Sequence, residues 1–136
     1  MKELVEKAAQ LCLQYHAGQV DKQGEPYFLH PFRVMMKCQT DEERIVALLH
    51  DIIEDTDYTI KEIRNIFGDK IANSLIFISR GQGEKYFDYI DRLSKDSLAI
   101  AVKLKDLEDN LDESRGSIPG ELKKRYIKTL DILKSK

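Results

Sequence analysis

The chain has 136 residues, of which 42% are hydrophobic and 34% are charged, with 22 basic and 24 acidic side chains. This length can bury a core of ordinary size, so we expect a single domain over residues 1–136. The formal net charge of −2 excludes a strongly basic protein, and we expect no binding to a nucleic acid polymer.

The amino-terminal segment has the periodicity of an amphipathic helix. Leu4, Ala8, Leu11 and Tyr15 recur at steps of three and four residues, and the pattern ends near Gly18. The segment contains acidic residues and lacks a cleavage site made of small residues, and no apolar run in the chain approaches the length of a membrane span. We therefore expect a soluble, cytoplasmic protein that does not bind a membrane.

The two cysteines, Cys12 and Cys38, lie in segments that are predicted to be helical. They lack the paired spacing of a zinc-binding or redox motif. We interpret both as small buried apolar side chains, which is typical of a protein from a reducing compartment.

A loop with two glycines and two prolines, residues 18–31, leads to a second helix that contains Phe32, Val34, Met35 and Met36. Asp41 is expected to cap a third helix over residues 43–55, because acidic side chains stabilise helix amino termini. A fourth helix is expected to begin at Thr59, with Glu62 completing a capping box, and to end near Gly68.

Further helices are predicted over residues 69–79, 84–95, 96–112 and 119–134, separated by short turns. No alternating strand pattern of useful length is present, so the fold class is predicted to be all-α, a compact helical bundle. The last helix carries an apolar stripe and is expected to close the bundle. A basic surface or a contact in a homodimer are the alternatives for this helix.

The helix predicted over residues 43–55 has an apolar stripe and a polar side that is unusually rich in ionisable groups. At about 100° per residue, the stripe collects Ile45, Leu48, Leu49, Ile52 and Ile53. The other side collects His50, Asp51, Glu54 and Asp55. This side is either a solvated polar face or part of a functional site.

Two further residues favour a functional site. His30 lies between two prolines among aromatic residues, where an unpaired imidazole would be costly to bury. Asp106 follows Ala99 and Val102 on the same face of a predicted helix. Two histidines and two aspartates from three helices form a mixed nitrogen and oxygen ligand set, which suits Mn²⁺, Fe²⁺ or Zn²⁺ with open positions for water.

His30, His50-Asp51 and Asp106 resemble the H…HD…D signature of the HD superfamily, which comprises all-helical, metal-dependent phosphohydrolases. The stretches GEPYFLHP, ALLHDIIEDT and VKLKDLEDN are similar to the hydrolase domain of RelA/SpoT-type enzymes and of small stand-alone alarmone hydrolases. The similarity extends over residues 5–112. It implies removal of the 3′ pyrophosphate from guanosine tetra- and pentaphosphate with Mn²⁺.

The resemblance also implies a role for individual residues. The implied metal ligands are His30, His50, Asp51 and Asp106. The implied catalytic pair, which handles protons, is Glu54 and Asp55. The implied substrate-binding residues are Lys22 and Asn110.

The chain departs from the family pattern at three positions. Asp21 and Leu107 stand where arginine is usual, and Asp109 stands where histidine is usual. These changes weaken the prediction of an alarmone substrate more than the prediction of phosphohydrolysis. The alternatives are another HD nucleotide phosphatase, of the nucleoside monophosphate or NADPH type, or a metal-bearing nucleotide-binding module without turnover.

Phosphate substrates also require cations. The candidates in the sequence are Lys22, Arg33, Lys37, Arg80, Lys85 and Arg92. Tyr86 and Tyr89 can stack on a base or pack in the core. Packing is the preferred interpretation, because Phe87, Ile90 and Leu93 recur at helical spacing nearby.

Overall fold

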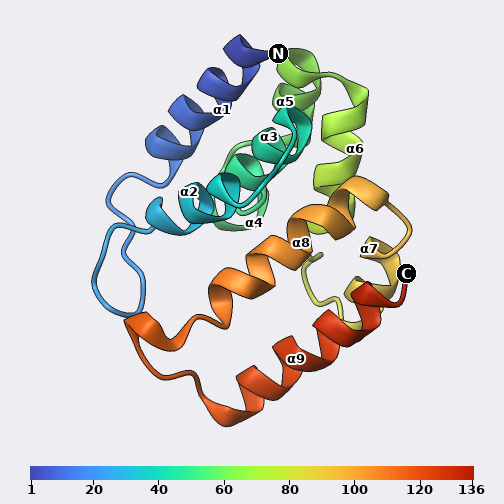
Figure 1. Ribbon diagram of the computed structural model, residues 1–136. Helices are drawn as coiled ribbons and strands as arrows, with labels where there is room; N and C mark the ends of the chain where they lie inside the picture. Colours follow the sequence, from blue (N-terminus) through green and yellow to red (C-terminus); the bar gives the residue numbers. More distant parts are fainter.

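The computed structural model describes residues 1–136 and contains helices but no β-strand, so the all-α prediction is confirmed (Figure 1). One isolated β-bridge joins Val20 and Pro26 in the loop after the first helix. The helices in chain order are α1 (Lys2–Tyr15), α2 (Leu29–Met36), α3 (Asp41–Leu49), α4 (Ile52–Asp55), α5 (Ile60–Phe67), α6 (Asp69–Ile78), α7 (Tyr86–Leu93), α8 (Ser97–Asn110), the 3-10 helix η1 (Glu113–Arg115) and α9 (Gly120–Lys134).

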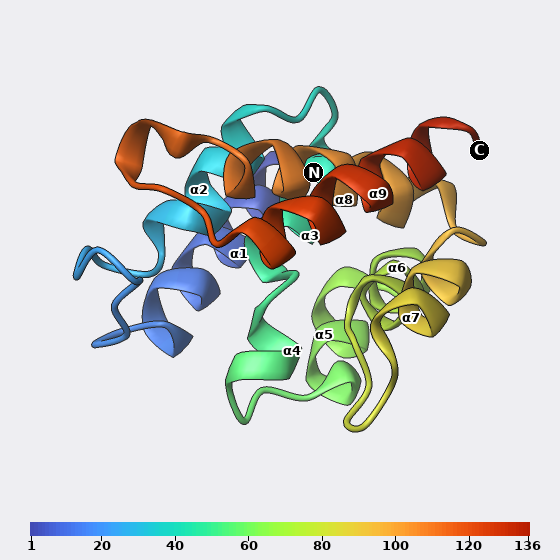
Figure 2. The same cartoon turned by 90° about the horizontal axis from the view of Figure 1, so that it is seen from below.

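Helix α3 is the centre of the fold and packs against α1, α2, α6 and α8. Its five residues from Ile45 to Leu49 are all fully buried, so the second half of this helix is covered on every side. Helix α8 contacts α2, α3 and α6 on one side and α9 on the other. In Figure 2 α8 and α9 lie side by side, with α4 and α7 away from them. The residues of interest on α2, α3 and α8 therefore come from neighbouring helices.

Apart from the third helix, the helix boundaries lie close to the predicted ranges. Two caps were predicted from the sequence, and the structure tests both. At α5 the side chain of Thr59 accepts a hydrogen bond from the amide of Glu62, as predicted. At α3 the prediction was wrong: Thr40, not Asp41, is the cap, and its hydroxyl accepts from the amide of Glu43. Asp41 is instead the first helical residue, where its charge interacts favourably with the helix dipole.

The helix predicted over residues 43–55 is interrupted, which corrects the sequence analysis. Helix α3 ends at Leu49, and α4 begins at Ile52. His50 Nδ1 hydrogen-bonds to the carbonyl of Ala47, the group that would accept from the amide of Asp51 in a continuous helix. The interruption therefore falls at the His50-Asp51 pair, although both residues keep backbone angles of the right-handed helical region.

The core consists of one cluster of 25 buried apolar residues. It includes both cysteines, which are unpaired thiols, as predicted. In α7, Tyr89, Ile90 and Leu93 are buried, but the assignment of Phe87 to the core was wrong, since this side chain is 38% exposed. Tyr86 is on the same face as Tyr89 and Leu93, and Phe87, the next residue, is turned about 100° away from that face.

None of the helices combines the length and apolar character that crossing a membrane would require. The extent of the domain, residues 1–136, stays a prediction.

Candidate active site

Two histidines and one aspartate meet where α2, the α3–α4 junction and α8 converge. A ligand atom from each of His30, His50 and Asp106 lies within 4.8 Å of the other two, and all three residues are buried. His30 is the second residue of α2, and Asp106 lies in the third turn of α8. The cluster thus joins residues that are far apart in the sequence, as the ligand prediction required.

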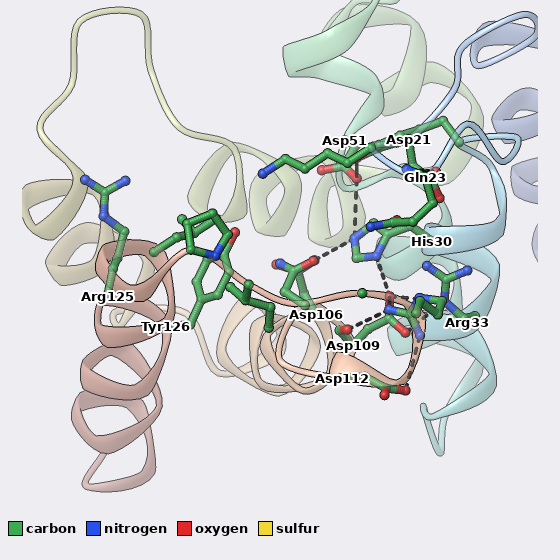
Figure 3. Close-up of a pocket in the computed structure, with 18 of the residues that line it drawn as sticks. Asp21, Gln23, His30, Arg33, Asp51, Asp106, Asp109, Asp112, Arg125 and Tyr126 are labelled. Carbon is green, nitrogen blue, oxygen red and sulfur yellow. Dashed lines mark hydrogen bonds and ion pairs between the residues drawn. The ribbon is translucent and has the colours of Figure 1, made fainter.

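Hydrogen bonds fix the orientation of both imidazole rings. Nδ1 of His30 lies 2.7 Å from Oδ2 of Asp109, and its Nε2 lies 2.8 Å from Oδ1 of Asp106 (Figure 3). Nδ1 of His50 contacts the carbonyl of Ala47, and its Nε2 lies 3.2 Å from the same Oδ1. Both rings therefore use Nδ1 for a structural contact and direct Nε2 at one carboxylate oxygen.

Asp51 lies beside this cluster. Its Oδ2 is 3.2 Å from Nε2 of His50 and 3.8 Å from Nε2 of His30. The hydroxyl of Tyr27 donates a hydrogen bond of 2.6 Å to the same oxygen. Burial and the charge of Asp51 raise the pKa of Tyr27, so the phenol stays protonated and remains a donor.

Protons on the two imidazoles balance the negative charge of the carboxylates in the cluster. Burial opposes ionisation of Asp106, but the ammonium of Lys103, 3.0 Å away, and the two imidazoles hold its pKa well below the usual range. Burial likewise favours neutral His30, yet hydrogen bonds to Asp106 and Asp109 raise its pKa to about 10. The pKa of His50 is also raised, because Asp51 and Asp106 outweigh its burial.

The donor set fits a divalent metal ion. Two protonated imidazoles carry the same total charge as one divalent cation, so exchanging protons for such an ion preserves the charge balance of the buried carboxylates. Two nitrogen and two carboxylate donors suit borderline first-row ions. The carboxylate of Asp109 behind His30 adds the outer hydrogen bond that metal-bound histidines typically have.

A cavity of about 690 Å³ opens above the cluster, a volume within the range of small-molecule sites, roughly 300–1,000 Å³. Its wall includes His30, Asp51 and Asp106. The predicted residues Lys22, Glu54 and Asn110 also line it. The remaining lining cations and tyrosines are Arg33, Arg80, Lys103, Arg115, Arg125, Tyr27, Tyr86, Tyr89 and Tyr126.

The two predicted catalytic acids differ in position. Glu54 lines the cavity. Partial desolvation of its carboxylate by the surrounding protein and the negative charge of Asp51 raise the pKa of Glu54 to about 7. Asp55 is exposed and does not line the cavity, although partial desolvation by surrounding protein and the charge of Asp51 raise its pKa as well. A carboxyl group with a pKa near neutrality can both accept and donate a proton under ordinary conditions.

Three of the six cations proposed from the sequence line the cavity: Lys22, Arg33 and Arg80. The other three, Lys37, Lys85 and Arg92, do not, and Arg92 instead pairs with Glu84. Lys103, Arg115 and Arg125 also line the cavity and were not predicted from the sequence. For Lys103 a signal existed, since it precedes Asp106 by three residues on one helix and such positions are neighbours.

The three departures from the family pattern have structural explanations. Asp21 Oδ1 accepts hydrogen bonds from the amides of Gln23 and Glu25, which orders the loop that carries Lys22. Leu107 is fully buried in the core. Asp109 is buried, contacts His30 and accepts a hydrogen bond of 2.9 Å from Nε of Arg33. Asp109 therefore supports the ring of His30, and Leu107 belongs to the core.

Comparisons with known proteins identify the family of the chain. A family model described as an HD domain matches residues 8–107. The chain is 35% identical over 121 residues, 80% of its length, to a guanosine-3′,5′-bis(diphosphate) 3′-pyrophosphohydrolase of Aquifex aeolicus, and these residues are 17% of that protein. It is 29% identical over 94% of its length to a GTP pyrophosphokinase of Streptomyces coelicolor, again 17% of that protein. The chain thus spans about a sixth of the length of these curated relatives.

A solved structure described as a metazoan orthologue of SpoT that hydrolyses ppGpp has the same fold. The TM-score is 0.79, with 22% sequence identity, over 96% of this chain and 85% of that chain. The helices of the present structure therefore have an arrangement already known from an experimental structure.

Proposed function

The chain belongs to the HD domain family, and from this membership we propose that it is a metal-dependent pyrophosphohydrolase that acts on guanosine 3′-pyrophosphates. One observation carries the proposal. His30, His50 and Asp106 converge on one point, and His30, Asp51 and Asp106 line a cavity of a size suited to a nucleotide. The relatives named 3′-pyrophosphohydrolases support the choice of substrate.

In this proposal His30, His50, Asp51 and Asp106 hold the ion, and Mn²⁺ is the ion of first choice, with Fe²⁺ and Zn²⁺ as alternatives. The bound cation supplies Lewis acidity at the phosphate group and lowers the pKa of water. Tyr27 keeps the carboxylate of Asp51 oriented toward the histidines. Asp109 does the same for the ring of His30.

The reaction adds water across the bond between the 3′ oxygen and phosphorus, and releases pyrophosphate and a nucleoside 5′-diphosphate. Glu54 takes the proton of the attacking water, because its pKa of about 7 leaves a large fraction of the carboxylate free at neutral pH. The protonated Glu54 then returns a proton toward the 3′ oxygen, and Asp55, which lies next to it but outside the cavity wall, is the proposed partner of Glu54 in this exchange. Lys22 and Asn110, which both line the cavity, position the substrate.

Product identification tests the function. The protein is loaded with Mn²⁺ and incubated with guanosine tetraphosphate, and the products are separated by ion-exchange chromatography. Equal amounts of GDP and pyrophosphate are expected. Orthophosphate as the product would indicate a phosphatase of another kind, and tight binding of intact nucleotide without any product would indicate a binding module.

A further inference from the structure

Two guanidinium groups share one aromatic ring at the far end of the cavity. Cζ of Arg125 lies 4.5 Å from the ring centroid of Tyr86, and Cζ of Arg80 lies 5.6 Å from it. Arg80 follows α6, Tyr86 begins α7 and Arg125 belongs to α9, and all three line the cavity. Figure 3 shows Arg125 with Tyr126 on the side of the cavity opposite His30 and Arg33.

Both arginines have N–H groups that donate no hydrogen bond within the protein. The guanidinium of Arg125 makes no hydrogen bond and no ion pair, and that of Arg80 makes one hydrogen bond, from Nε to the carbonyl of Glu84 at 2.8 Å. The carboxylate of Glu84 is already paired with Arg92 at 2.9 Å. The far end of the cavity therefore has uncompensated positive charge.

The arginines near the histidine cluster are different. Arg33 pairs with Asp109 at 2.9 Å, and Arg115 pairs with Asp112 at 3.2 Å and with Asp109 at 3.4 Å. Their charge is largely offset by carboxylates that belong to the protein. The positive charge available to a ligand, apart from that of Lys22, is thus concentrated at the end opposite the cluster.

The shared ring is held in place by the last helix. The hydroxyl of Tyr86 is hydrogen-bonded to Oγ1 of Thr129 at 3.2 Å, and Thr129 is fully buried one turn after Arg125. A guanidinium that rests on an aromatic ring keeps its edge free for acceptors. The spacing of guanidinium donors matches the oxygens of a phosphate group, which allows two parallel hydrogen bonds.

We propose that Arg80 and Arg125 form a second anion subsite, which binds the 5′-phosphates of a nucleotide whose 3′-pyrophosphate lies at the histidine cluster. This inference rests on the proposed function, because that function fixes which end of the nucleotide reaches His30 and His50. The subsite selects substrates that carry phosphate at both ends, since a nucleotide with a 3′-pyrophosphate alone leaves the two arginines without a partner.

Binding of GDP tests the subsite without any reaction, because GDP has the 5′-diphosphate and lacks the 3′-pyrophosphate. Isothermal titration of the Mn²⁺-loaded protein compares GDP with guanosine. We expect GDP to bind at least about tenfold more tightly than guanosine, and Arg80→Gln or Arg125→Gln to weaken GDP binding about tenfold each. The affinity for guanosine and for Mn²⁺ should not change.

Lys124→Gln is the matched control, because it removes a positive charge from the same helix at an exposed position that does not line the cavity. It should leave GDP affinity unchanged. The subsite is refuted when GDP affinity is the same in the double arginine variant and the parent, or when Lys124→Gln reduces it equally. The experiments distinguish the two proposals. A parent protein that releases no pyrophosphate contradicts the proposed function. An affinity for GDP that does not depend on Arg80 or Arg125 contradicts the subsite.

Discussion

Nδ1 of His30 on α2 lies 2.7 Å from Oδ2 of Asp109 on α8, and both side chains are buried. Asp109 follows Asp106 by three residues, so one face of α8 supplies a carboxylate to each nitrogen of the same imidazole. The pair leaves the His30 ring a single orientation, in which Nε2 faces the cluster.

Asp109→Asn should weaken the binding of Mn²⁺ by about 10- to 100-fold, because it removes the charge that orients His30. Titration calorimetry measures this affinity, and thermal unfolding followed by circular dichroism measures stability separately. Asp112→Asn is the control, since it removes the neighbouring carboxylate that pairs with Arg115 at an exposed position. A loss of stability with unchanged Mn²⁺ affinity would mean that Asp109 serves the fold only.

Glu54→Gln should keep the metal ion and lower kcat by about 10²- to 10⁴-fold, because the amide cannot take the proton of water. The base must be deprotonated, so the rate of the parent should rise with pH, with a midpoint at or below about pH 7. This rising limb should be absent in the variant. Unchanged turnover would identify Glu54 as a structural acid of the cavity wall.

Leu107→Ala tests whether this departure from the family pattern is a core residue. The side chain is fully buried, so its truncation should lower the free energy of unfolding by about 2–5 kcal/mol. The KM for guanosine tetraphosphate should not change. Urea denaturation and steady-state kinetics provide the two measurements, and a changed KM at unchanged stability would place Leu107 in contact with substrate instead.

The ion pair between Glu84 and Arg92 gives a pH-dependent contribution to stability. Hydrogen bonds from Arg92 and from the amide of Gly81 lower the pKa of Glu84 to about 2. A lowered folded-state pKa stabilises the fold above the unfolded value, about 4.3, and this contribution is lost as the pH falls toward 2. Glu84→Gln should therefore be less stable than the parent at pH 7, and the difference should shrink below about pH 4.

Urea denaturation at several pH values tests this contribution. Glu121→Gln is the matched control, because Glu121 is almost fully exposed and its contact with Lys124, at 3.6 Å, is loose. A stability difference for Glu84→Gln that stays constant between pH 7 and pH 3 would contradict the role of the ion pair.

The helices could be predicted because they depend on local signals, and the expected convergence of His30, His50 and Asp106 is present in the structure. Periodicity located every long helix, and Thr59 with Glu62 marked a cap that the structure has. The interruption at His50 could not be predicted from a helical wheel, because the wheel assumes a continuous helix and cannot anticipate the contact from His50 to the Ala47 carbonyl.

The surroundings of the site were harder to predict because they depend on tertiary contacts. Asp109 was interpreted as the loss of a histidine, whereas its role follows from a contact with His30, 79 positions earlier. The shared ring of Tyr86 was assigned to packing, since nothing in its own helix indicates that Arg80 and Arg125 approach it. Both features depend on contacts between residues that are far apart in the sequence.

The central claim is that His30, His50, Asp51 and Asp106 together hold a divalent ion. Asp51 is the best position to test, because Asp106 is tied to Lys103 in the buried interior and its loss would disturb the fold. Elemental analysis of the purified parent and of Asp51→Ala, both dialysed after loading with Mn²⁺, is the most direct measurement. We predict one equivalent of the ion in the parent and little or none in the variant, and equal metal content in the two proteins would contradict the claim.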